Sequence, residues 1–193
     1  AIGIYGIGEM LWTLEETKGR VQMSKLSVNM REVGRAFSAL KKTFMAMNIG
    51  SFLGFFVGIL PAAGATPASL MSYGITKQLS RNSKEFGAGV PAGVVAPECA
   101  NNSASTGSML PMLTLGIPGS PTTAILLGGM ILWGLTPGPL LFTQQPEFVW
   151  GLIGSLYIAN FFTLVLNIAL IPAFLMVLRI PFAILAPVIF VLC

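Results

Sequence analysis

Charged side chains almost disappear from the second part of this chain. After residue 85 only Glu98, Glu147 and Arg179 carry a charge. Over the whole chain 9% of the residues are charged and 54% are hydrophobic, against roughly 25% charged in a soluble domain. Helices satisfy their own backbone hydrogen bonds in lipid, so this pattern predicts an all-α integral membrane protein.

The formal net charge of +4 comes from basic residues in two loops, within residues 15–43 and 77–84. Clustered Lys and Arg in short loops indicate the cytoplasmic side of a membrane protein. No basic groove with interleaved aromatic residues is present, so nucleic acid is not an expected partner. The lipid bilayer is the expected partner of the apolar segments.

The chain contains no histidine, which excludes Ser-His and Cys-His catalysis and every His-ligated metal site within it. An intramembrane enzyme would need another base to activate Ser103, Ser105 or Ser120. Cys99 and Cys193 are too few for a disulfide framework, and we expect both to be buried structural residues. The protein is therefore not expected to be an enzyme or to carry a cofactor.

The apolar segments predict a single membrane domain over residues 1–193. The chain lacks an initiator Met and is apolar at both ends, so we expect a fragment of a longer multi-pass protein. The expected order is the end of a transmembrane helix (1–14), a cytoplasmic basic loop (15–43), a re-entrant hairpin (44–76), a broken transmembrane helix (86–117), transmembrane helices (120–136 and 148–178) and the start of a truncated helix (181–193).

The hairpin follows from length and charge. Residues 44–76 exceed the about 20 residues of one span but are too short for two spans and a turn. Pro61, Gly64 and Pro67 interrupt the segment in its middle, and basic residues flank both ends. The spacing of Gly50, Gly54 and Gly58 predicts a smooth face for close helix packing.

The segment 86–117 contains a polar island, Pro97–Gly107, within apolar sequence. Polar groups at such depth mark a functional site by default. We expect two half-helices meeting at Asn101 and Asn102, where unwound carbonyls and amide side chains could hold Na⁺. Glu98 could carry a coupling proton, or it could bond backbone groups and fix the broken helix; the second role is preferred.

A second turn, Gly116–Thr123, precedes an apolar run and offers amide and hydroxyl donors, although Ser and Thr there also suit ordinary helix capping. The candidate substrate- or ion-binding residues are Pro61, Gly64, Ala65, Thr66, Glu98, Asn101, Asn102, Ser103, Gly116, Pro118, Gly119, Ser120 and Thr122.

With these motifs identified, the chain resembles the large membrane subunit of the tripartite tricarboxylate transporter family (TctA type), and specifically the second of its two related halves. The motifs that carry the resemblance are Leu60–Thr66, Phe86–Gly89, Ala96–Asn102, Leu113–Ser120 and Thr136–Pro139. The family often has Pro-Gly at the hairpin turn, where this chain has Pro61-Ala62-Ala63-Gly64, and small alanines where it has Cys99 and Ser103.

The resemblance implies a transporter-type repeat with a re-entrant helical hairpin and a discontinuous transmembrane helix, in a bacterial inner membrane. It also implies Na⁺- or H⁺-coupled uptake of small di- or tricarboxylates such as citrate. The partners would be a periplasmic solute-binding protein and a small four-helix membrane subunit. A passive channel or a structural membrane subunit is the alternative, since channels also use re-entrant loops.

Overall fold

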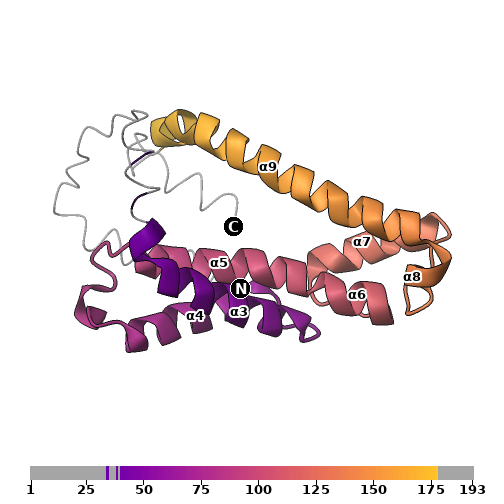
Figure 1. The fold of residues 1–193 in the computed structure, drawn as a ribbon, viewed down its shortest axis with the longest axis horizontal. Coiled ribbons are helices and arrows are strands. Elements are labelled where there is room, and N and C mark those ends of the chain that lie inside the picture. The colour runs from indigo at the N-terminus through magenta and orange to yellow at the C-terminus, as the bar shows by residue number, and fades with distance from the viewer. Residues whose placement is uncertain (1–33, 35–37, 39, 178–193) are drawn as a thin grey trace, which may run out of the picture. The chain divides into compact units, whose positions relative to one another are not determined.

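The computed structural model describes residues 34, 38 and 40–177 (Figure 1). Within these residues the structure is helical, without strands, as the sequence predicts. The predicted segments 1–14 and 181–193 and most of the basic loop lie outside them. The elements are α3 (Phe44–Ile59), α4 (Ala65–Leu79), the 3₁₀ helix η1 (Ser83–Glu85), α5 (Ala92–Gly107), α6 (Met109–Leu115), α7 (Pro121–Leu132), α8 (Leu141–Gln144) and α9 (Pro146–Val177).

Residues Gly34–Leu156 form one compact unit, and the part of α9 from Tyr157 onward belongs to a second. In the first unit α5 packs against both α3 and α4. The segment predicted as a hairpin, 44–76, is indeed two helices joined by a short turn. Gly50, Gly54 and Gly58 meet α5 in the order of its own sequence, so α3 runs parallel to α5. Helix α4 runs antiparallel to both.

The α3–α5 interface is built from backbone rather than side chains. A Cβ atom added at Gly50, Gly54 or Gly58 would collide with the carbonyl oxygen of Ala96, Ala100 or Ala104 respectively. All six residues are buried. Small residues at four-residue spacing let two helix backbones approach this closely, which is the main source of helix association in lipid. The packing role predicted for the three glycines is confirmed.

Helix α4 packs against α5 and the segment before it through a hydrogen bond, a ring contact and a row of small polar residues. The Ser69 hydroxyl donates a hydrogen bond to the Pro97 carbonyl at 3.0 Å, and the Tyr73 ring packs edge-on against Phe86, with ring centroids 5.6 Å apart. Ser72 and Thr76 continue the same buried face, but their hydroxyl oxygens have no hydrogen-bond partner. These two hydroxyls oppose the packing of α4 rather than support it, because a buried unpaired hydroxyl is unfavourable.

The helix over residues 86–117 is broken, but not where the sequence analysis placed the break. Asn101 and Asn102 lie inside α5, which is continuous from Ala92 to Gly107. The discontinuity, which we call the α5–α6 break, is the single residue Ser108, whose backbone keeps helical dihedral angles (φ −68°, ψ −17°) and whose amide still bonds the Ala104 carbonyl. Pro111 explains it, since a proline lacks the N–H that would bond the carbonyl four residues earlier, at Gly107. The prediction of half-helices meeting at Asn101 and Asn102 is therefore wrong in position.

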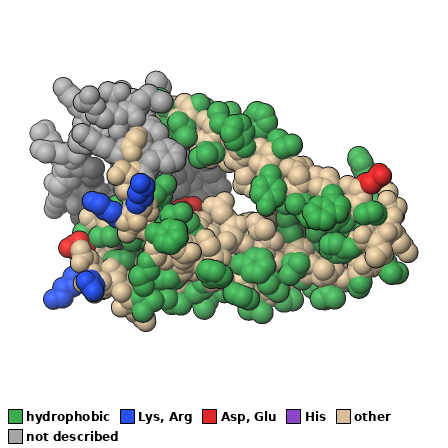
Figure 2. Space-filling view, viewed as in Figure 1, with side chains coloured by type: hydrophobic (Ala, Val, Ile, Leu, Met, Phe, Trp, Pro, Cys, Tyr) green, Lys and Arg blue, Asp and Glu red, His purple; other side chains and the backbone are tan. Residues whose placement is uncertain are grey.

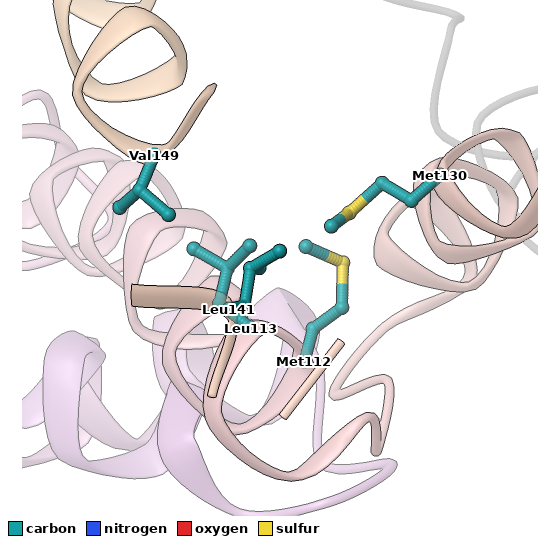
Figure 3. Packing of buried hydrophobic residues seen from close by; sticks show 5 residues of the cluster. All are labelled: Met112, Leu113, Met130, Leu141 and Val149. Carbon is teal, nitrogen blue, oxygen red and sulfur yellow. The ribbon is translucent and has the colours of Figure 1, made fainter. Parts of the chain in front are cut away.

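An apolar cluster joins α6, α7, α8 and the start of α9. Its buried members are Met112, Leu113, Met130, Leu141 and Val149, whose side chains converge in Figure 3. The predicted transmembrane segment 120–136 is helical only over α7, and the short helix α8 lies between it and α9. Through this cluster α7 packs against α6, the helix that follows Ser108.

Among the described residues, one helix is long and apolar enough to cross a bilayer by length and composition: Pro146–Phe174, within α9. It corresponds to the segment 148–178 and continues through Pro172. Helices α3 and α7 are apolar but shorter.

Candidate functional site

Helix α5 has two unlike faces. Ala96, Ala100 and Ala104 are buried against α3 and α4. The opposite face is exposed and polar, and we call it the α5 polar face; it consists of Glu98, Asn101, Asn102, Ser105 and Thr106. Helical periodicity places these positions side by side over about two turns.

Most side chains of the α5 polar face bond to the helix itself. The Asn102 amide nitrogen donates to the Glu98 carbonyl at 2.9 Å, and the Ser105 hydroxyl donates to the Asn101 carbonyl at 3.1 Å. Thr106 donates to the Asn102 carbonyl at 3.4 Å. The amide and hydroxyl oxygens stay available to accept a hydrogen bond or to ligate a cation, and the remaining amide N–H groups of the two asparagines can still donate.

Glu98 is exposed, and its carboxylate forms no hydrogen bond or ion pair with any residue that the structure describes. The role preferred from the sequence, in which this carboxylate fixes a broken helix by bonding backbone groups, is not seen. Helix α5 needs no such support here because it is continuous. Glu98 therefore adds a negative charge to the α5 polar face without an internal partner.

The turn Gly116–Ser120 is fixed against the end of α5. Gly116 ends α6 in the left-handed conformation, with φ of 69°. A Cβ atom at Gly119 would lie 2.8 Å from the Ser108 Cβ and 3.1 Å from the Gly58 carbonyl oxygen. Only glycine fits there without displacing backbone. The turn thus joins the end of α3 to the α5–α6 break.

Ser120 begins α7 as a capping residue. Its hydroxyl accepts a hydrogen bond from the Thr123 amide at 3.2 Å, and the Thr123 hydroxyl accepts one from the Ser120 amide at 2.9 Å. This is a capping box, in which two helix-start donors are satisfied reciprocally. Ordinary helix capping, the alternative to substrate binding at this turn, accounts for the hydrogen bonds of both the Ser120 amide and the Ser120 hydroxyl. Thr122 is exposed.

Sequence reasoning missed Ser108, which is 1% exposed. Its hydroxyl donates to the Ser105 carbonyl at 2.8 Å and lies 3.4 Å from the Ser120 hydroxyl. It therefore links the α5 polar face to the Gly116–Ser120 turn. The sequence feature that could have indicated Ser108 is its position three residues before Pro111, since a proline removes a helical backbone hydrogen bond.

The turn between α3 and α4 contains two left-handed residues, Ala62 with φ of 60° and Gly64 with φ of 69°. Ala65 packs against the buried alanines of α5, whereas Pro61 and Thr66 are exposed. The structure thus brings Ala65, Gly119 and Ser120 to the end of α5. Ser103 is half-buried within α5. Among the described residues no group of three or more His, Cys, Asp or Glu could hold a metal ion.

A family model described as the tripartite tricarboxylate transporter TctA family matches residues 1–193. The chain belongs to this family. Two relatives come from Agrobacterium vitis. One, an uncharacterized 52.8 kDa protein in the TAR-I ttuC' 3' region, is 38% identical over 99% of this chain and 38% of its own length. The other, an uncharacterized protein in the TAR-II ttuC' 3' region, is 46% identical over 70% of this chain and 56% of its own length.

The chain thus spans little more than a third of one relative and just over half of the other. No solved structure matches it. The resemblance seen in the sequence motifs is confirmed. TctA is a family of membrane transport components rather than of enzymes, which agrees with the absence of catalytic residues expected from the sequence.

Proposed function

We propose that this chain is part of the large membrane subunit of a cation-coupled carboxylate transporter. The observation that carries the proposal is the α5 polar face. Glu98, Asn101 and Asn102 are exposed on a helix whose other side is sealed against α3 and α4. Polar side chains that face lipid are unfavourable, so such a face has to line an aqueous path or meet a polar partner.

The chemistry of this face suits a small anion and a cation bound together. The free oxygens of Asn101 and Asn102 and the Glu98 carboxylate are hard ligands suited to Na⁺, or in the case of Glu98 to a proton. A bound cation would in turn offset the charge of a substrate carboxylate. No Lys or Arg lies in 86–178, so the site would release its anion when the cation leaves.

We propose that α3 and α4 form a re-entrant hairpin. Both are too short to span a bilayer, and the turn at Ala62–Gly64 joins them at the end away from their basic flanks. A solute-binding protein in the periplasm and a small membrane subunit are the proposed partners in a bacterial inner membrane. The tripartite name of the family supports two further components.

The test is uptake by the full-length protein with both partners in proteoliposomes. Labelled citrate and shorter dicarboxylates are supplied with a Na⁺ gradient, a proton gradient or neither. We expect gradient-dependent uptake and counterflow, both lost in Asn102→Ala. Counterflow distinguishes a carrier from a channel, because a channel does not exchange bound substrate. Unchanged uptake in Asn102→Ala would remove the α5 polar face from the site.

Glu98→Gln separates the two coupling ions in the same assay. If Na⁺ drives uptake through the Asn pair, the variant retains uptake under a Na⁺ gradient. If Glu98 carries the proton, the variant loses gradient-driven uptake but retains counterflow. Ser51→Ala is the matched control, because Ser51 is exposed on α3, away from α5.

A further inference from the structure

Within the described residues, every Lys and Arg lies at one end of the helix hairpin. These residues are Lys41, Lys42, Lys77, Arg81 and Lys84, and we call them the basic end. In the space-filling view the Lys and Arg side chains gather on the left, and the apolar surface beyond them contains none (Figure 2). Three separate parts of the sequence contribute to this one cluster.

The register of the helices brings these parts together. Gly50 of α3 touches Ala96, and Ser69 of α4 bonds to the next residue of α5, Pro97, so Gly50 and Ser69 lie at the same level. Lys42 lies just before α3, whose first residue, Phe44, is nearly two helical turns before Gly50, and Lys77 lies about two turns after Ser69. Because α3 and α4 run in opposite directions, moving back along α3 from Gly50 and moving forward along α4 from Ser69 lead to the same end of the hairpin. Lys42 and Lys77 therefore lie at a common level.

Arg81 and Lys84 lie in the segment that follows α4, and this segment is held in place. Phe86 is buried, with its ring against Tyr73 of α4 and 3.4 Å from where a Cβ atom of Gly93 would lie. Residues 80–85 are consequently tied back to the start of α5. Their cations stay near Lys77 rather than on a free loop.

The five cations are not neutralised by ion pairs within the part of the chain that the structure describes. None of them forms an ion pair with a carboxylate among the residues that the structure describes. The nearest acidic residue in sequence, Glu85, accepts a hydrogen bond from Asn82 at 3.3 Å. Like charges gathered at one end repel each other and raise the energy of the hairpin, and external anions would relieve this repulsion.

Large apolar side chains surround the basic end. Phe44 and Met45 begin α3 and Leu79 ends α4, and they are 66%, 59% and 57% exposed. A collar of exposed apolar side chains next to a ring of cations is the arrangement found where a protein passes from acyl chains to headgroups. This arrangement suits a position at the depth of the lipid phosphates.

We propose that the basic end binds the phosphate groups of anionic phospholipids and thereby fixes both ends of the α3–α4 hairpin to the same membrane surface. The proposal depends on the membrane setting of the protein and not on its transport activity. Lipid binding would fix the hairpin at its basic end, while packing against α5 stabilises α3 and α4 along their lengths.

The test is lipid binding by the purified full-length protein in nanodiscs, with a photoactivatable phosphatidylglycerol at low mole fraction in phosphatidylcholine. We expect crosslinks in peptides that contain residues 40–45 and 76–86. Neutralising one cation, as in Lys77→Gln, should reduce the apparent affinity for phosphatidylglycerol about fivefold, which corresponds to about 1 kcal/mol per charge. Raising the salt concentration to about 1 M should weaken binding in the wild type.

The charge-retaining variant Lys41→Arg, Lys42→Arg, Lys77→Arg, Arg81→Lys and Lys84→Arg is the matched control and should bind like the wild type. Lys77→Gln with unchanged crosslinking, or equal labelling by a phosphatidylcholine probe, would overturn the proposal. So would competition by millimolar inorganic phosphate, which would make the cluster a site for a free anion. If Asn102→Ala leaves uptake unchanged while phosphatidylglycerol binding is as described, only the proposed function is affected.

Discussion

Gly54 of α3 lies against the backbone of Ala100 in α5, with no space for a methyl group between them. We expect Gly54→Ala to lower the free energy of unfolding by about 3 kcal/mol, since overpacking at a backbone contact cannot be relieved by a rotamer change. Thermal unfolding of the full-length protein in detergent measures this. Gly128→Ala is the control, because a Cβ atom there meets nothing within 4 Å, and it should be neutral or stabilising by about 1 kcal/mol. Equal effects of the two variants would contradict the packing described here.

Ala62 in the hairpin turn has φ of 60°, a conformation that suits glycine. A left-handed non-glycine residue costs about 1–2 kcal/mol, so Ala62→Gly should raise the free energy of unfolding by about 1 kcal/mol. Ala63→Gly, at the neighbouring position without a positive φ, should instead lower it slightly. Comparison of the two unfolding midpoints is the measurement, and a lower midpoint for Ala62→Gly would show that the turn is built differently.

Ser69 and Ser72 form a natural pair on α4, because one hydroxyl is bonded and the other is not. Ser69→Ala removes the bond to the Pro97 carbonyl and should destabilise by about 1 kcal/mol. Ser72→Ala and Thr76→Val remove unpartnered buried hydroxyls, so we expect them to be neutral or stabilising by about 1 kcal/mol. If all three variants lost stability equally, Ser72 and Thr76 would have partners that the structure does not show.

Ser120 tests whether the Gly116–Ser120 turn is structural or binds substrate. Ser120→Ala removes the capping box and should cost about 1 kcal/mol, whereas Ser120→Asn keeps a capping side chain and should restore stability. We expect uptake KM in the proteoliposome assay to be unchanged in the Asn variant. A raised KM with normal stability would assign the Ser120 hydroxyl to the substrate.

The helix packing could be predicted from the sequence because it depends on local spacing. Three glycines four residues apart have few uses in an apolar helix other than close approach, and the structure uses them so. That residues 44–76 form two helices joined by a turn followed from Pro61 and Gly64, whereas their re-entry into the membrane stays a prediction. Family membership followed from several motifs in a fixed order.

The position of the helix break was not predicted, because the break was expected at the polar residues Asn101 and Asn102. Asn101 and Asn102 are polar, but each retains a helical backbone bond and can sit on an exposed face. The break lies at Ser108, where Pro111 removes a donor. The contact of Gly119 with Gly58 joins positions 58 and 119, far apart in the sequence, and no local pattern indicates such a pairing.

The backbone contact between α3 and α5 also determines how this part of the protein can move. Side chains at an ordinary helix interface can change rotamer and let the helices slide, but at Gly50, Gly54 and Gly58 there are none to adjust. Helices α3 and α5 must then travel as a single rigid piece, or separate entirely. During a transport cycle we therefore expect the hinges to be outside this pair, at the Ala62–Gly64 turn and at the break beside Ser108.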